Sequence, residues 1–120
     1  MSVDFDKFNS VISLFDKQST TLSEKPYLWH KIDNEYLPLT WKQVRNKVKK
    51  LSIVLKNLGI LKGDRVVIVS ENRPEWQISD LAIMAIGAIT VPAYITNTTT
   101  DHEYIIKHSG ARCLIVSNHD

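Results

Sequence analysis

The stretch GDRVVIVSENRPEWQISDLAIMAIGAITVPAYITNTTTDHEYIIKHSGARCLIVS, residues 63–117, decides the fold of this chain. Three short stretches with β-branched residues, at 65–69, 88–94 and 111–116, alternate with two helical patterns. Antiparallel neighbours need only tight turns, whereas parallel strands need crossover connections long enough to hold a helix. The stretch therefore predicts an α/β fold with a partial parallel sheet and crossover helices.

The two crossover helices carry recognisable end signals. We expect the first to begin near Asn72, because Pro74 suits a first turn and Glu75 favours the positive end of the helix dipole. We expect Thr100 to cap the second helix in a capping box with Glu103. Gly110 then ends that helix.

The first 62 residues predict a helix, a hairpin and a second, longer helix. Apolar residues at three- and four-residue intervals place a helix near the start, followed by a polar connection over 17–25; they are Phe5, Phe8, Val11, Ile12 and Phe15. Strands at 27–32 and 35–39 flank Asp33 and Asn34, which tolerate a two-residue turn. Thr40 and Gln43 form a capping box, and Gly59 ends the long helix. Its predicted buried face consists of Trp41, Val44, Val48, Leu51, Leu55 and Leu58.

The chain accordingly divides into a helix and connection (1–26), a hairpin (27–39), and a helix plus a βαβαβ unit (40–120). With 120 residues, 43% of them hydrophobic and a net charge of +2, we expect one domain with a modest core and no nucleic-acid partner. The single Cys113 lies in an apolar run, which predicts a buried, reduced thiol and a cytoplasmic location. The N-terminus lacks a signal-peptide core, and the longest apolar stretch, 81–94, is too short to span a membrane.

The long helix has a basic face with no acidic residue between Lys42 and Lys62. Two interpretations stay open: a solvated face that maintains solubility, which is the commoner case, or contact with anionic lipid or a phosphorylated ligand. The residues concerned are Lys42, Arg45, Lys47, Lys49, Lys50 and Lys56.

Ligands of open parallel sheets gather outside the carboxyl ends of the strands. In this chain those ends are at 70–72, 94–98 and 117–119, so Ser70, Glu71, Asn97, Ser117 and His119 are places to look for a site. A helix start explains residues 72–75 apart from Arg73, which is the one unexplained charge. A loop that ends in a cap explains residues 97–100, although their hydroxyls and amide could also face a substrate.

Other kinds of site find little support in the sequence. The four histidines, at 30, 102, 108 and 119, have no metal-ligand spacing, and Ser70 and Ser117 lack a nucleophile elbow. Four glycines, at 59, 63, 87 and 110, cannot form a glycine-rich phosphate loop. We therefore predict no catalytic, cofactor-binding or metal-binding residue within this chain.

Motifs over residues 27–120 together resemble the opening of AMP-forming acyl-CoA synthetases. They are the hairpin, the capped amphipathic helix, GDRV at 63–66, NRPEW at 72–76, GAITVPAY at 87–94 and YIIKHSGARCLIV at 104–116. Within this adenylate-forming superfamily, NRPEW and VPAY resemble the long-chain fatty acid CoA ligase branch most. The implied fold is an incomplete N-terminal subdomain of the adenylate-forming fold.

The resemblance implies an enzyme that activates a fatty acid on ATP, with Mg²⁺, to acyl-adenylate and pyrophosphate, and then transfers the acyl group to coenzyme A. It also implies that the phosphate-gripping loop, the adenine- and magnesium-binding motifs and the C-terminal lysine domain lie beyond Asp120. We therefore expect this segment alone to be inactive. Its expected partners are the remainder of the synthetase and, in the full-length enzyme, the fatty acid.

The predicted strands at 88–94 and 111–116 are apolar on both faces. The helices of this chain are too few to cover both faces of the sheet and its edge. Self-association through the exposed sheet would follow. Peripheral contact with the inner face of a membrane is a separate expectation for the partners of this chain. Two alternative functions remain: an adenylating enzyme for aryl, short-chain or amino acids, and a small α/β binding module without catalysis.

Overall fold

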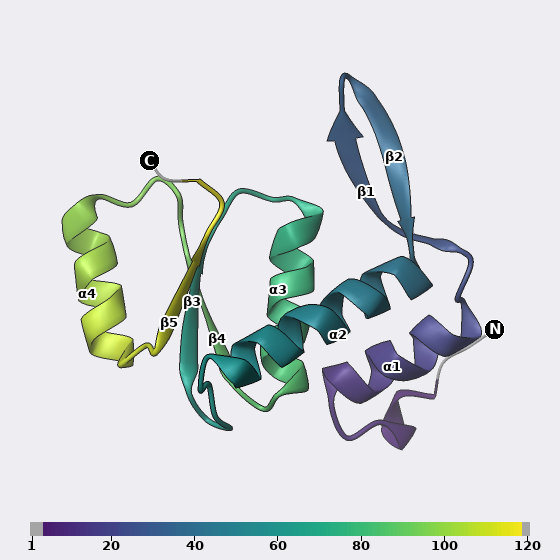
Figure 1. Cartoon of the computed structure of the whole chain (residues 1–120), viewed down its shortest axis with the longest axis horizontal. Coiled ribbons are helices and arrows are strands. Elements are labelled where there is room, and N and C mark those ends of the chain that lie inside the picture. The colour runs from purple at the N-terminus through teal and green to yellow at the C-terminus, as the bar shows by residue number, and fades with distance from the viewer. Residues whose placement is uncertain (1–3, 119–120) are drawn as a thin grey trace. The chain divides into compact units, whose positions relative to one another are not determined.

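A computed structural model describes residues 4–118, apart from the side chain of Phe5 (Figure 1). The chain divides into two compact units, Met1–Lys47 and Val48–Asp120. The boundary falls within a helix, so each unit is described by itself. His119, a candidate site residue, lies outside the described residues.

The first unit begins with a short 3-10 turn, η1 (Phe5–Lys7), and a helix, α1 (Val11–Thr21). A helix near the start is present, but its predicted bounds were wrong: Ser10 caps α1, so the helix begins after Phe8 and continues to Thr21, through part of the expected connection. The Ser10 hydroxyl accepts from the Ser13 amide at 3.2 Å. Hydroxyls in the last turns, such as that of Ser19, bond to carbonyls one turn back and so fit within the helix.

The hairpin of the first unit forms as predicted, from β1 (Pro26–Ile32) and β2 (Glu35–Thr40). Asp33 and Asn34 form its turn with φ of 49° and 64°, the left-handed values that a two-residue turn needs. An aromatic cluster packs beside it: the Tyr27 and Trp41 rings stack with centroids 3.8 Å apart, and Phe15 lies 5.9 Å and 6.0 Å from them.

The long helix, α2 (Trp41–Asn57), has the predicted ends. The Thr40 hydroxyl accepts from the Gln43 amide at 3.1 Å, the Gln43 side chain accepts from the Thr40 amide at 2.9 Å, and Gly59 has a φ of 88°. Val44, Val48 and Leu55 are buried, as predicted. Leu58 is 67% exposed, contrary to the prediction, because it follows the last helical residue and leaves the buried stripe.

The second unit is a three-stranded parallel sheet with crossover helices. Its elements are β3 (Arg65–Val69), α3 (Pro74–Ala85), β4 (Ile89–Ala93), α4 (Thr99–Ser109) and β5 (Cys113–Val116). The strand order is β4-β3-β5, with both pairings parallel, and α3 and α4 lie on opposite sides of the sheet (Figure 1). The predicted α/β class, parallel sheet and crossover helices are confirmed.

The core of the second unit lies between β3 and α3. The buried apolar residues include Val66, Val67, Ile68, Ile78, Leu81 and Ile83. Helix α4 has no buried residue, and Leu114 and Val116 of β5 are about half exposed. Cys113 is only partly buried, contrary to the prediction, since β5 has a neighbouring strand on one side alone.

The start of α4 also differs from the prediction. Thr98 caps the helix, and Asp101 completes the capping box, whereas Thr100 and Glu103 were expected in these roles. The pair Thr98 and Asp101 satisfies the same three-residue spacing and starts the helix earlier. Glu103 instead forms an ion pair with Lys107. Gly110 ends the helix with a φ of 65°, as predicted.

Within residues 4–118, no helix combines the length and the apolar character that crossing a bilayer requires.

Candidate functional site

The candidate site lies where the carboxyl ends of β3 and β5 meet. The chain moves from β3 to β4 on one side, and then returns past β3 to form β5 on the other. In open α/β sheets such a reversal of strand order leaves a crevice between the two strands where the order reverses, and ligands commonly bind there. Here the crevice is bordered by residues 70–75 after β3 and by Ser117 after β5.

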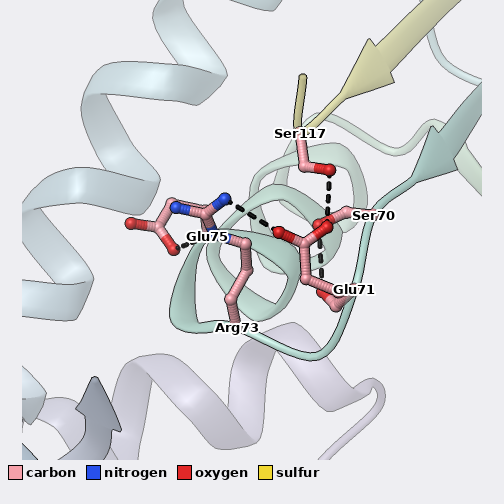
Figure 2. A network of polar contacts seen from close by, with 5 residues as sticks. All are labelled: Ser70, Glu71, Arg73, Glu75 and Ser117. Carbon is pink, nitrogen blue, oxygen red and sulfur yellow. Dashed lines mark hydrogen bonds and ion pairs between the residues drawn. The ribbon is translucent and has the colours of Figure 1, made fainter. Parts of the chain in front are cut away.

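A chain of polar contacts joins these two segments (Figure 2). The Ser117 hydroxyl donates to one carboxylate oxygen of Glu71 at 2.6 Å, and the Arg73 Nη1 donates to the other at 3.1 Å. The Arg73 Nε donates to Glu75 at 2.9 Å. The Ser70 hydroxyl donates to the Glu71 backbone carbonyl at 2.9 Å, which fixes the loop at its start. We call Glu71, Arg73, Glu75 and Ser117 the crevice network.

The local sequence explains why these groups meet. Arg73 is the residue before α3 and has extended backbone angles, while Pro74 begins the helix. The backbone therefore turns sharply at Arg73. Glu71 precedes this turn by two residues and Glu75 follows it by two. Ser117 reaches Glu71 because its backbone amide extends the sheet by donating to the Val69 carbonyl at 3.2 Å.

Contacts within the crevice network shift the pKa values of Glu71 and Arg73. The Ser117 hydroxyl and the Glu71 backbone amide hold the pKa of the Glu71 carboxyl below its ordinary value, and Arg73 adds to this. The hydrogen bond to Glu75 raises the pKa of Arg73. Glu71 is therefore an ionised acceptor at neutral pH. Since a hydrogen bond already occupies each of its carboxylate oxygens, its geometry suits holding the loop to β5 better than acting as a base.

Two hollows flank the crevice network, one on each face of the sheet. The smaller, with a volume of about 160 Å³, lies on the α3 side, and Trp76 and Ile115 line it together with Arg73 and Ser117. The larger, about 670 Å³, lies on the α4 side. Its lining is partly apolar, with Leu114 and Val116, and partly polar, with Glu71, Asn97, His102 and Ser117.

His102 has an unusual place in the larger hollow. Its Nδ1 atom is shielded from solvent and has no hydrogen-bond partner among residues 4–118. The sequence predicted a surface histidine, but the side chain is half-buried because α4 turns it toward the sheet. Such an atom is a ready hydrogen-bonding group for whatever fills the hollow.

The structure brings some of the predicted site residues together and leaves others apart. Ser70, Glu71 and Ser117 meet, and Asn97 and Thr99 line the larger hollow together with Glu71 and Ser117. Asn72, Tyr94 and Thr100 are exposed, and Thr98 serves as the helix cap. Arg73, the unexplained charge, has two carboxylate partners.

Sequence reasoning missed Glu75 and His102 as members of this region. Glu75 was assigned to the helix dipole alone, although its spacing from Arg73 also permits an ion pair across the helix start. His102 gives no sequence signal, because its burial depends on the position of α4 against β5.

The described residues do not fit a magnesium or nucleotide-phosphate site. No group of three His, Cys, Asp or Glu side chains among residues 4–118 is placed to hold a metal ion. The turns at the strand ends also lack the glycine-rich backbone that cradles phosphates.

Comparison with known proteins identifies the family. Residues 15–120 match the family described as "AMP-binding enzyme". The chain is 39% identical over 80 residues to the long-chain-fatty-acid–CoA ligase FadD15 of Mycobacterium tuberculosis, covering 67% of this chain and 13% of that protein. It is 33% identical over 100 residues to fatty acyl-CoA synthetase A of Dictyostelium discoideum, covering 83% of this chain and 15% of that protein.

Solved structures agree with this assignment. The N-terminal subdomain of Klebsiella oxytoca NpsA, in complex with 3-hydroxybenzoyl-AMSN, superposes with a TM-score of 0.81 at 29% identity, covering 94% of this chain and 28% of that one. The predicted fold, that of an N-terminal subdomain of adenylate-forming enzymes, is confirmed. The chain spans less than a third of each of these proteins. From residue 15 onward, this chain belongs to the AMP-binding enzyme family.

Proposed function

We propose that this chain is the opening part of the N-terminal domain of a long-chain fatty acid CoA ligase. The observation that carries the proposal is the match of residues 15–120 to the AMP-binding family, together with relatives named as long-chain and fatty acyl-CoA ligases. The reaction of the full-length enzyme joins a fatty acid to coenzyme A through an acyl-adenylate. We place it in the cytoplasm, where the free Cys113 stays reduced.

Within that enzyme the role of this segment is to form one side of the sheet. The crevice network holds the loop before α3 to the end of β5, so it fixes the edge on which the remainder of the synthetase assembles. The exposed Leu114 and Val116 and the open edge of β5 offer an apolar surface to further strands and helices. In their absence the same surface favours self-association.

ATP, Mg²⁺ and coenzyme A are assigned to parts of the full-length enzyme other than this segment. The donor groups described here fit neither the metal nor the phosphates, so other parts of the enzyme are proposed to bind both. The segment alone is accordingly proposed to be inactive.

The test is to express the whole reading frame that encodes this chain and to measure AMP and acyl-CoA formed from palmitate, octanoate and benzoate. We expect activity that depends on coenzyme A and is greatest with palmitate, and none from residues 1–120 alone. Acyl-CoA formation by the 120-residue chain would contradict the scaffold role. A reading frame that ends at Asp120 would favour the binding module without catalysis.

A second candidate is an aryl acid adenylating enzyme. It is favoured by the NpsA structures, which are described with 3-hydroxybenzoyl-AMSN and 3-hydroxyanthranilyl-AMSN, and which superpose closely on this chain. Greater activity with benzoate than with palmitate in the same assay would select it.

A further inference from the structure

The charges of this chain are unevenly distributed. Residues 36–63 contain seven basic and no acidic residues, whereas the rest of the chain contains eight basic and 13 acidic residues. Two of the seven are paired in the first unit: Lys42 lies 3.7 Å from Glu24, and Arg45 lies 2.9 Å from Asp16. In the second unit, no ion pair among the described residues includes Lys49, Lys50, Lys56 or Lys62.

The same part of the second unit also exposes large apolar side chains. Ile53 and Val54 on α2 are 51% and 50% exposed, and Leu58 and Leu61 after its end are 67% and 68% exposed. Single exposed apolar residues are ordinary, but four within this short span are not. Between the two leucines, Gly59 turns the chain and Ile60 is buried, so the leucines project from an anchored turn.

On α2 the lysines and the apolar residues are interleaved on one face, and the turn that follows adds Leu58, Leu61 and Lys62 next to them in sequence. Side chains four apart lie on the same face of a helix, so Lys50 and Val54 are neighbours, and Lys49 and Ile53 form the adjacent row. Lys62 follows Leu61 directly, and its Cγ would lie 3.1 Å from a Cβ added at Gly87, so its stem lies along that glycine. Long stems of this kind let the ammonium groups reach a polar layer while apolar neighbours go deeper.

Nucleic acids and membranes are both anionic partners that bind basic protein surfaces. Single strands are bound by aromatic side chains on which bases stack, with Arg adding cation–π contacts. Residues 48–62 contain neither an aromatic residue nor an arginine. Aliphatic side chains among lysines instead match the boundary between acyl chains and anionic headgroups.

We propose that this surface binds the face of an anionic lipid bilayer without crossing it. Its members are Lys49, Lys50, Lys56, Lys62, Leu58 and Leu61, named here the lysine–leucine surface. The lysines supply electrostatic attraction to anionic headgroups, and the two leucines enter the headgroup layer. The inference does not depend on the proposed enzyme function, although long-chain fatty acids, which partition into bilayers, would be found at such a location.

The test is sedimentation of the 120-residue chain with phosphatidylcholine vesicles, with and without phosphatidylserine. We expect binding only to the anionic vesicles. The variant Lys49→Gln/Lys50→Gln/Lys56→Gln is expected to weaken binding by about fivefold per lysine removed. The variant Leu58→Ser/Leu61→Ser is expected to bind more weakly and to be released completely at high salt, because only the screened attraction remains.

The matched control is Lys17→Gln/Lys25→Gln/Lys31→Gln, which removes the same charge from exposed lysines of the first unit. This control should bind as the unsubstituted chain does. Circular dichroism checks that each variant is folded, which we expect because every altered side chain is exposed. An equal loss of binding in both lysine variants, equal binding to neutral vesicles, or tighter binding to single-stranded RNA than to vesicles would each overturn the proposal. No ATP or fatty acid is needed, so this result is independent of the enzyme assay.

Discussion

The two crossover helices of the second unit are stabilised in different ways. Helix α3 buries Ile78, Leu81 and Ile83, yet no side chain caps its start. Helix α4 buries no residue, yet it has a complete capping box, a left-handed glycine at its end and an ion pair along its surface. Burial therefore stabilises α3, whereas local interactions stabilise α4, and the face of the sheet next to α4 remains partly exposed.

The largest expected difference in stability is between alanine variants of two leucines. Leu81 on α3 is 1% exposed, and Leu114, whose strand faces α4, is 45% exposed. We expect Leu81→Ala to lower the free energy of unfolding by about 2–5 kcal/mol, since it leaves a cavity in the core. We expect Leu114→Ala to cost about 1 kcal/mol or less, because the site is half open to water. Urea unfolding followed by circular dichroism measures both.

Similar losses for the two leucine variants would contradict the comparison. That result would show that the α4 side of the sheet is covered in solution, for example by a second copy of the chain. Sedimentation velocity at two protein concentrations would test this explanation. A dimer fraction that grows with concentration would indicate a covering second copy, whereas a monomer at both concentrations would assign the loss to contacts within one chain.

An intermediate effect is expected at the cap of α4. Thr98→Ala removes the hydroxyl that accepts from the Asp101 amide at 3.2 Å. A lost cap typically costs about 1 kcal/mol, and α4 has no burial to compensate for it. Hydrogen exchange of the α4 amides should speed up while that of α3 does not. Thr99→Ala is the matched control, since Thr99 is exposed and caps nothing; equal acceleration in both variants would refute the cap.

The smallest expected effect is a dependence of the folding stability on pH. The folded pKa of Glu71 is depressed, so its contribution to stability is present above 4.5, the ordinary value, and is lost as pH falls through the folded value. Asp101 is depressed too, chiefly by hydrogen bonding to the Thr98 backbone amide. We expect acid to loosen β5 from the loop before α3, and also to weaken the α4 cap.

Ser117→Ala separates these two effects. It removes the largest cause of the Glu71 shift and leaves Asp101 unchanged. The melting temperature of this variant should fall less steeply between neutral and acidic pH than that of the unsubstituted chain. An unchanged slope would assign the acid sensitivity to groups other than Glu71.

Local signals predicted much of the fold. The capping pair Thr40 and Gln43, the turn at Asp33 and Asn34, and the crossover pattern of residues 63–117 each specify a conformation through neighbours in sequence. The α4 cap was misplaced because TNTTTDHE offers two pairs at the same spacing, Thr98 with Asp101 and Thr100 with Glu103. Local rules permit both pairs, since each has an acidic residue three positions after a threonine.

The candidate site was less predictable, because it depends on strand order. The strand ends were identified correctly as the places to look, but the contact of Ser117 with Glu71 requires β5 to lie beside β3 rather than beside β4. The half-burial of His102 likewise depends on where α4 packs. Neither property is encoded within a short window of sequence.

The strand order also has a consequence for the order of folding. Helix α3 and β4 follow β3 directly, so one edge of β3 is paired early, but its other edge pairs with β5, where Val66 meets Cys113. Chains emerge from the ribosome at about 5–20 residues per second, so this second edge stays open for some seconds after the first has closed. During that interval the nascent chain presents an unpaired apolar strand, and this is the stage at which a chaperone would be needed most.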